Sequence, residues 1–305
     1  MYYLNRVLKK INRKKFLKKS KKTSGILRKV MGNKNIGIVD IGAGHRYLPI
    51  LLNFDGLSKI AMVDPNDNIN WSYRNFKKIL NYPDNVKKYQ FGISQNTKKA
   101  KYYKTKTSTG SSFVNVYQKA KKKNRLLDEN YFGKKNEIEA QLYSFNDFVK
   151  LFFKHKVDVV KIDVEGLELN IIKSILKKHS PLLIEVETNM NHEIYNNSFN
   201  AINNILTKKN YQILTAFPVY KNINDSTNEK PFVYGDYNNP IFRSPLEQIE
   251  CIYVKKSNNN FLTKIVILIG YGFIFEAKNY LENIKRRLSK NKYLLIKRLI
   301  EKFNI

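Results

Sequence analysis

Cysteine is nearly absent from this chain of 305 residues, and long apolar runs are few. The single cysteine, Cys251, excludes an intramolecular disulfide and any metal cluster built from cysteines, so we expect a reducing, cytoplasmic setting. Ile265 to Phe275 is an unbroken run of eleven apolar or glycine residues, about half of the roughly 20 that a helix needs to span a bilayer. The start of the sequence holds no stretch like the roughly 7 to 15 apolar residues of a signal-peptide core. We therefore expect neither a secretion signal nor a membrane span.

Acidic residues are also scarce. The 25 Asp and Glu residues stand against 56 Lys and Arg residues, which gives a net charge of +31. Residues 1–30 carry twelve of the cations and no acid, and residues 257–305 carry ten cations and three acids. Because the excess is concentrated at the two ends, it favours contact with phosphate groups of a membrane or a nucleic acid through the tails. We divide the chain into a basic helical segment (1–32), a central domain (33–256) and a basic extension (257–305).

Both ends of the sequence have the spacing of amphipathic helices. In the first, the apolar residues that recur among cations are Leu4, Val7, Leu8 and Ile11. Thr23 and Ser24 can cap a second short helix that runs to Met31 and closes at Gly32. Near the end, one apolar helical face consists of Leu281, Ile284, Leu288, Leu295 and Leu299. Such a helix can lie on an anionic membrane, where each cation contributes about 1 kcal/mol to binding. Alternatively, the extension packs on the domain or forms a solvated or oligomerising helix.

The most informative stretch runs from Ile36 to Gly44 and reads Ile-Gly-Ile-Val-Asp-Ile-Gly-Ala-Gly. Beta-branched residues bounded by glycine predict a strand that is covered on both faces, as in a parallel sheet. Gly42 and Gly44 can adopt backbone angles that are closed to other residues, and they leave no side chain between the main chain and a ligand. The pattern predicts a nucleotide site formed by Asp40, Gly42, Ala43 and Gly44.

A second apolar run, Lys59 to Val63, ends in Asp64, 20 residues after Gly44. An acid there can accept hydrogen bonds from both hydroxyls of an adenosine ribose. A dinucleotide fingerprint requires a third glycine where this chain has Tyr47, so the pattern disfavours NAD. Asp40 instead suits a ligand with an ammonium and a sulfonium group. We therefore predict S-adenosylmethionine as the cofactor.

The rest of the central domain alternates between strand and helix patterns, which is the order of a parallel sheet with crossover helices. The further predicted strands are 86–91, 157–163, 181–187, 211–217 and 248–254, and the predicted helices include 47–55, 71–80 and a segment that ends at 207. Gly92 and Ile93 follow the third strand and are predicted to lie beside the adenine. Short alternating runs over 98–142 predict a β-rich insertion. Residues 218–247, rich in Asn, Pro and aromatics, predict a functional lid or a disordered segment.

Acids also follow the strand pattern of 157–163. Ligands bind beyond the carboxyl ends of strands in open parallel sheets, so Asp163 is expected at the same edge as Asp40 and Asp64. Asp163 and Glu165 are the candidate proton acceptors, because neighbouring carboxylates raise the pKa of one of them. Glu187 and His192 stand behind them as further candidates.

Other interpretations of these acids stay open. Glu165 and Glu168 also suit the first turn of the following helix, where they complement its dipole. Asp163, Glu165 and Glu187 offer oxygen ligands of the kind that Mg²⁺ takes. Their spacing is not diagnostic of a metal, and we predict none.

Five segments together resemble, in that order, the FkbM family of S-adenosylmethionine-dependent methyltransferases. They are Val39 to Gly44, Asp64, the run Gly110-Ser111-Ser112, the block Lys161 to Glu168 (Lys-Ile-Asp-Val-Glu-Gly-Leu-Glu) and Pro181 to Glu187. The resemblance spans roughly residues 33–256, and the Lys161 to Glu168 block is its most specific part. The chain departs from it after the glycine turn, where members often have Asn and then Gly and this sequence has His45, Arg46 and Tyr47.

The resemblance implies an α/β fold of the Rossmann-like class I methyltransferase type, with a doubly wound, mostly parallel seven-stranded sheet. It also implies methyl transfer to a hydroxyl oxygen of a small molecule or glycan. Two rival functions remain. A nucleic-acid methyltransferase suits the charge, but the strand end at Asp163 lacks the Asn/Asp-Pro-Pro-Tyr arrangement that holds a base amine. A non-catalytic scaffold with membrane- or RNA-binding tails is opposed by the acids at all three expected strand ends.

Overall fold

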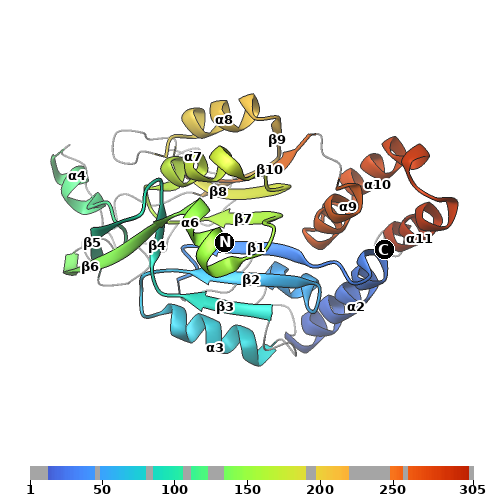
Figure 1. Ribbon diagram of the computed structural model, residues 1–305, viewed down its shortest axis with the longest axis horizontal. Helices are drawn as coiled ribbons and strands as arrows, with labels where there is room; N and C mark the ends of the chain where they lie inside the picture. Colours follow the sequence, from blue (N-terminus) through green and yellow to red (C-terminus); the bar gives the residue numbers. More distant parts are fainter. Residues whose placement is uncertain are drawn as a thin grey trace, which may run out of the picture.

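A seven-stranded sheet forms the centre of the computed structural model, which describes residues 13–44, 49–79, 85–105, 111–122, 134–189, 197–219, 248–256 and 260–301. Its strand order is β3-β2-β1-β7-β8-β10-β9 (Figure 1). The strands are β1 (Ile36–Ile41), β2 (Ser58–Val63), β3 (Val86–Tyr89), β7 (Val159–Ile162), β8 (Leu183–Asn189), β9 (Tyr211–Val219) and β10 (Gln248–Lys255). Numbered within this sheet alone, the order is 3-2-1-4-5-7-6.

Strand directions confirm the predicted doubly wound, mostly parallel sheet. β3, β2, β1, β7 and β8 run parallel to one another, and only β10 runs antiparallel to its neighbours β8 and β9. Parallel neighbours need crossover connections, which the predicted alternation of strands and helices supplies. β9, antiparallel to β10, runs in the same direction as these five, so the carboxyl ends of six strands lie at one edge.

The central strand β1 is buried along its whole length because helices cover both faces of the sheet. Ile36 and Ile38 pack on one face with α2 (Arg13–Met31), the 3₁₀ helix η1 (Pro49–Phe54) and α9 (Phe261–Gly270). Val39 and Ile41 pack on the other face with α6 (Phe145–Phe148), α7 (Glu168–Lys178) and α8 (Phe199–Lys208). The π-helical turn η3 (Val149–Phe153) continues α6, and α3 (Ile69–Ile79) lies along β3 at the edge of the sheet (Figure 1).

The predicted β-rich insertion is a separate three-stranded sheet. It consists of β4 (Gly92–Ser94), β5 (Lys98–Thr105) and β6 (Lys134–Ser144), in the order β4-β6-β5. A short helix, α4 (Val116–Lys122), was not predicted. Figure 1 shows this sheet and α4 at the end of the main sheet toward which β1, β2 and β3 point. The insertion therefore stands where ligands of an open parallel sheet bind.

The second helix expected in the N-terminal segment begins earlier in the chain than predicted, and the first expected helix, with Leu4 to Ile11, lies outside the described residues. Within the described residues the segment is the single helix α2, so the prediction that Thr23 and Ser24 cap a second helix is wrong. Both are buried inside α2, and the Ser24 hydroxyl donates to the Lys21 carbonyl 3.0 Å away, which satisfies it without a helix end. Gly32 ends the helix as expected, with φ of +60° and its amide 2.8 Å from the Arg28 carbonyl. Residues 1–12 lie outside the described part.

The C-terminal extension packs against the domain. It forms α9, α10 (Ile274–Asn283), the 3₁₀ turn η4 (Lys285–Arg287) and α11 (Lys290–Glu301). Leu281, Ile284 and Leu299, expected to share one helical face that either meets a membrane or packs on the domain, lie in the same core as β1 and α2 and are at most 5% exposed. The chain also turns between α10 and α11, so the expected continuous helix is broken. Among the described helices, none combines the length and the apolar character that crossing a bilayer requires.

Two further expectations fall partly or wholly on residues that are not described. The predicted helix over 47–55 corresponds to η1, with 45–48 outside the described part. Of the predicted lid, 220–247 also lies outside it.

Candidate active site

The acids singled out in the sequence gather at the carboxyl edge of the main sheet. Asp40 lies in β1, Asp64 directly follows β2, and Asp163 directly follows β7. β1 lies between β2 and β7, so the three acids come from three adjacent parallel strands. The fold thus places the three acids on neighbouring strands, as the strand pattern predicted.

Asp64 organises the turn after β1. One oxygen of its carboxylate, Oδ2, accepts a hydrogen bond of 2.8 Å from the Gly44 amide, and the other, Oδ1, accepts one of 2.7 Å from the Asn66 amide. Burial raises the pKa of Asp64 to about 6, against the opposing effect of these two amide donors. A carboxylate oxygen has two lone pairs, so each oxygen keeps one for a further donor. Asp64 can therefore accept two hydroxyl donors without releasing the turn.

The glycines of this turn meet two different requirements. Gly42 has φ of +80°, and a Cβ at this position would overlap the carbonyl oxygen of Asp163. Gly44 has φ of +50°, and the nearest heavy atoms to a Cβ there are 3.8 Å away. Gly42 thus lets the turn pack on the end of β7, whereas Gly44 leaves an open side on which a ligand can approach the backbone.

Lys161 links Asp40 to Asp163, and sequence reasoning did not assign it a role. Its Nζ atom is 3.0 Å from Asp163 Oδ2 and 3.8 Å from Asp40 Oδ1. Asp40 and Lys161 face each other in the register of β1 and β7, and both are almost fully buried. Burial raises the pKa of Asp40 to about 6, although the Lys161 charge opposes this. Burial alone would lower the pKa of Lys161, but the carboxylates of Asp163 and Asp40 raise it above its ordinary value. Lys161 is therefore a buried cation that holds Asp163.

The network continues across the sheet beneath the C-terminal extension. Glu185 on β8 is paired with Lys161 in the sheet register, and burial together with the nearby Glu250 carboxylate raises its pKa. Tyr271, which follows α9, is also buried, and burial and the Glu185 carboxylate raise the pKa of its hydroxyl. The C-terminal extension therefore covers one side of the buried charged groups that surround Lys161.

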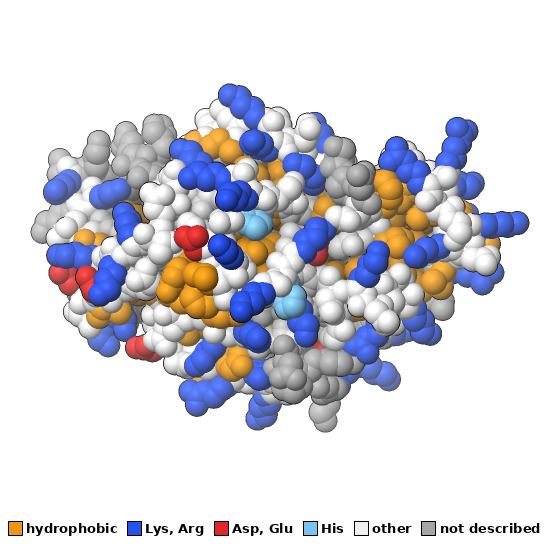
Figure 2. Space-filling model, in the orientation of Figure 1, with side chains coloured by type: hydrophobic (Ala, Val, Ile, Leu, Met, Phe, Trp, Pro, Cys, Tyr) orange, Lys and Arg blue, Asp and Glu red, His pale blue; other side chains and the backbone are white. Residues whose placement is uncertain are grey.

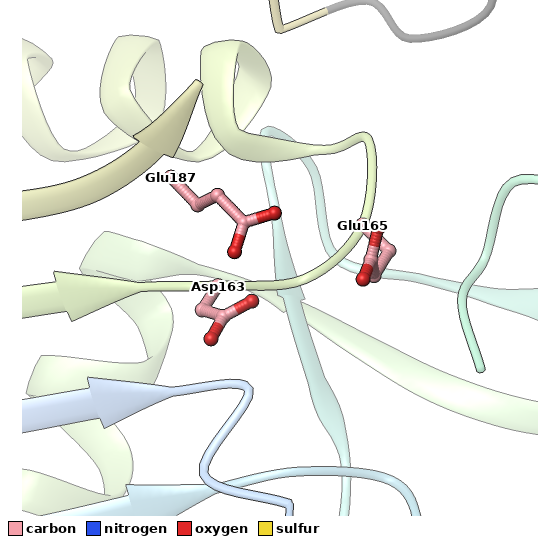
Figure 3. A group of neighbouring side chains, drawn as sticks. All are labelled: Asp163, Glu165 and Glu187. Atoms are coloured by element: carbon pink, nitrogen blue, oxygen red, sulfur yellow. The ribbon is translucent and has the colours of Figure 1, made fainter. Parts of the chain in front are cut away.

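Asp163 and Glu165, which follow β7, come together with Glu187, which lies near the carboxyl end of β8 (Figure 3). One carboxylate oxygen from each residue lies within 4.8 Å of those from both other residues. Glu165 has φ of +55°, an unusual conformation for a residue with a side chain, and it precedes α7. Carboxylate oxygens so placed are ligands of the kind that Mg²⁺ takes, and they can also accept a proton from a substrate. The side chain of Asp163 is 25% exposed and can be reached from solvent.

Glu168, and not Glu165, occupies the first turn of α7. Its carboxylate accepts hydrogen bonds from the amides of Val164 (3.1 Å) and Gly166 (2.9 Å). Burial raises the pKa of Glu168 to about 7. The helix-dipole interpretation therefore suits Glu168, which holds the backbone of the turn that carries Glu165.

The insertion contacts both loops of the site. The Ser112 hydroxyl lies 2.8 Å from the Glu165 carbonyl oxygen and 3.1 Å from that of Val164. Lys104 on β5 forms an ion pair of 3.1 Å with Asp67, three residues after Asp64. The Ser112 contact had a signal in the sequence, because Ser112 belongs to one of the segments that carry the family resemblance, but the Lys104 contact had none.

Gly92 and Ile93, predicted to lie beside the adenine, form part of β4. The Ile93 side chain is 2% exposed and packs in the core with Phe145 and Phe148. A Cβ on Gly92 would overlap the ring of Phe113. Any contact of these two residues with a cofactor would thus involve their backbone. His45 and His192 lie outside the described residues.

These residues fit S-adenosylmethionine. Asp64 is a buried carboxylate with an acceptor position left on each oxygen, which suits the two ribose hydroxyls. The open side of Gly44 lets the cofactor lie against the backbone of the turn. When bound there, the cofactor supplies an electrophilic methyl group.

Comparisons with known proteins identify the family of the chain. The sequence model described as the methyltransferase FkbM domain matches residues 40–213, which include Asp40, Asp64 and the whole Lys161 to Glu168 block. No curated protein matches the chain.

Among solved structures, the chain is similar to the methyltransferase FkbM from Methylobacillus flagellatus KT, with 12% identity and a TM-score of 0.41 over 72% of this chain and 43% of that one. It thus spans less than half the length of that protein. It is also similar to the magnesium protoporphyrin IX methyltransferase from Synechocystis PCC 6803, solved with bound S-adenosylmethionine (10% identity, TM-score 0.37, 78% and 79% covered). A third is a putative RNA methyltransferase from Pyrococcus horikoshii (9% identity, TM-score 0.36, 78% and 85% covered).

Proposed function

Because the chain belongs to the FkbM family of S-adenosylmethionine-dependent methyltransferases, we propose that it methylates a hydroxyl oxygen of a small molecule or glycan. The observation that carries this proposal is the partly exposed carboxylate of Asp163, held by Lys161 at 3.0 Å directly beside the glycine turn. An acceptor hydroxyl must lose a proton as its oxygen takes the methyl group. A carboxylate at this edge can receive that proton.

In this mechanism the chain does two things. It holds the acceptor oxygen in line with the methyl group, and such positioning supplies on the order of 7 to 11 kcal/mol. Asp163 accepts the proton at its carboxylate, and a general base contributes about 10² to 10⁴ in rate. Lys161 fixes the Asp163 side chain and offsets the negative charge of Asp40. Glu165 and Glu187 stand close enough to bind further hydroxyls of the acceptor.

The acceptor chemistry can be tested directly. Protein incubated with S-adenosylmethionine carrying a labelled methyl group is given hydroxyl acceptors, amine acceptors and RNA in parallel, and products are identified by mass spectrometry. The proposal predicts the label in a methyl ether. Label on nitrogen or carbon, or a clear preference for RNA, contradicts it and favours the rival functions. Identifying any acceptor that copurifies would narrow the panel.

We also propose a peripheral contact with anionic membranes, made by the outer face of α11. Most of the predicted apolar face lies in the core, but Leu295 from that face is 37% exposed on α11, as is its neighbour Leu294, next to exposed Lys297 and Arg298. Figure 2 shows Lys and Arg side chains over much of the visible surface and few acids. Apolar side chains flanked by cations suit a headgroup layer.

Full-length protein tests this contact, because removing the extension would expose the core. It should cosediment with phosphatidylserine vesicles, less as salt rises. A variant with Leu294→Ser, Leu295→Ser, Lys297→Gln and Arg298→Gln should bind more weakly, while the control Lys77→Gln with Lys78→Gln on α3 should bind as wild type does. Equal binding by both variants, or no binding by wild type, contradicts the contact.

A further inference from the structure

A cavity of about 340 Å³, broadly open to solvent, lies on the insertion. Its lining includes Tyr103, Phe113, Asn115, Gln118, Lys119 and Lys122. This volume is at the lower end of the roughly 300 to 1,000 Å³ of ligand sites, and it suits one ring-sized group. None of the described residues that line it is an acid.

One wall of the cavity is a single face of α4. Asn115, Gln118, Lys119 and Lys122 follow the spacing i, i+3, i+4 and i+7, which places their side chains on the same side of a helix. The Asn115 side-chain oxygen accepts a hydrogen bond of 3.0 Å from the Gln118 backbone amide. This bond fixes the Asn115 side chain at the start of the helix face. The wall presents amide groups and two ammonium groups.

The other wall is aromatic. Successive side chains of a strand point to opposite faces, so Tyr103 faces the cavity while its neighbour Tyr102 turns to Asn66 beside Asp64. Phe113 packs on Tyr102, with ring centroids 5.0 Å apart, and occupies the space that a side chain on Gly92 would fill. Tyr103 and Phe113 are thus the aromatic residues of the lining, beside the polar helix face.

The cavity adjoins the turn that carries the candidate base. Phe113 directly follows Ser112, whose hydroxyl is 2.8 Å from the Glu165 carbonyl oxygen. Consecutive Cα atoms are about 3.8 Å apart, so the aromatic wall begins one residue from this contact. The lining of the cavity is thus continuous in sequence with Ser112, which contacts the turn after Asp163.

We infer that this cavity, hereafter the α4 cavity, binds an anionic glycosyl group of the acceptor. A sugar ring has an apolar C–H surface, which suits Tyr103 and Phe113, and a rim of hydroxyls, which suits Asn115 and Gln118. Lys119 and Lys122 then bind a carboxylate or a phosphate on that sugar. The inference rests on the proposed function and adds the chemical class of its acceptor.

Binding of three probes to protein saturated with S-adenosylhomocysteine tests this inference. Glucuronic acid carries a carboxylate, glucose 1-phosphate carries a phosphate, and methyl glucoside is neutral. At least one anionic sugar should bind at least about tenfold more tightly than methyl glucoside, and the one that does so identifies the anion. If no anionic sugar binds, or if methyl glucoside binds equally well, the inference is overturned.

Matched variants locate the binding. Lys119→Gln with Lys122→Gln should weaken anionic-sugar binding about tenfold or more, while Lys98→Gln with Lys135→Gln, on the same sheet but outside the cavity, should stay within twofold of wild type. Tyr103→Leu should weaken it and Tyr103→Phe should not. Equal effects of the two lysine pairs overturn the inference, as does unchanged binding by Tyr103→Leu. S-adenosylhomocysteine affinity and methyl transfer, measured on the same samples, separate this outcome from failure of the proposed function.

Discussion

Asp64 Oδ2 accepts a hydrogen bond of 2.8 Å from the amide of Gly44, and this contact ties the end of β2 to the turn after β1. Asp64→Ala removes both the anchor of the turn and the acceptor for the ribose hydroxyls. We expect it to weaken S-adenosylhomocysteine binding by about 2 to 4 kcal/mol, since charge-assisted hydrogen bonds are lost. Calorimetry with wild type, Asp64→Ala and Asp64→Asn measures this. Equal affinities, or tight binding of NAD, would show that Asp64 does not hold an adenosine ribose.

Cofactor affinity should depend on pH near 6. Burial raises the pKa of Asp64 to about 6, and the ribose hydroxyls donate to its ionised form. Below pH 6 the protein must release a proton to bind, so affinity should fall by up to about tenfold per pH unit. Asp64→Asn should make cofactor affinity depend less on pH, and the dependence that remains would come from Asp40.

Unfolding does not explain such a loss of affinity, because the effect on stability has the opposite sign. The pKa values of Asp40 and Asp64 in the folded protein lie above the ordinary value of 3.8. Their contribution to stability is therefore complete below pH 3.8 and is lost as pH rises through about 6. Thermal unfolding of wild type and Asp64→Asn over this pH range checks the sign. A wild-type affinity that stays constant between pH 7 and 5 contradicts the ribose role.

Lys161 should act on catalysis through Asp163. Lys161→Met leaves Asp40 and Asp163 without their shared cation, so the pKa that governs the acidic limb of kcat/KM should rise by about one unit or more. Lys161→Arg keeps the charge and should shift this limb less. The Met variant should also be less stable by about 3 to 5 kcal/mol, because breaking a buried ion pair leaves a charge uncompensated. Lower stability with an unchanged pH profile would reduce Lys161 to a structural role.

The packing of the C-terminal extension can be tested at a glycine. A Cβ on Gly270 in α9 would overlap the buried ring of Phe54, so Gly270→Ala should destabilise the protein by about 1 to 3 kcal/mol. Gly25 in α2 is the matched control, because a Cβ there meets nothing within 4 Å and alanine should stabilise the helix by about 0.5 to 1 kcal/mol. Denaturant unfolding measures both. Two stabilising substitutions would mean that α9 does not pack on η1.

The sheet and its acids were predictable because both follow from local patterns. Alternating strand and helix segments require parallel strands, and the carboxyl ends of parallel strands share one edge, so Asp40, Asp64 and Asp163 had to approach one another. Lys161 was not predicted as a functional residue. Its role depends on the register between β1 and β7, which sets it opposite Asp40.

The C-terminal extension shows where local patterns stop being informative. Leu281, Ile284 and Leu299 form an apolar stripe that a membrane and a protein core satisfy equally well, and helical periodicity does not distinguish the two. The apolar stripe packs in the core because one face of the sheet beside α2 has room for it, and that face exists only after folding. Thr23 and Ser24 failed as caps for a related reason, because buried contacts of α2 carry the helix through them.

Asp163→Asn tests the central claim most directly, once an acceptor is in hand. Turnover of wild type and variant is compared at saturating S-adenosylmethionine, and S-adenosylhomocysteine affinity is measured on the same preparations. Turnover should fall by about 10² to 10⁴, with cofactor affinity within roughly tenfold of wild type, because a proton acceptor is lost while the ribose site remains. Turnover within threefold of wild type would contradict the account and move the role of base to Glu165 or Glu187.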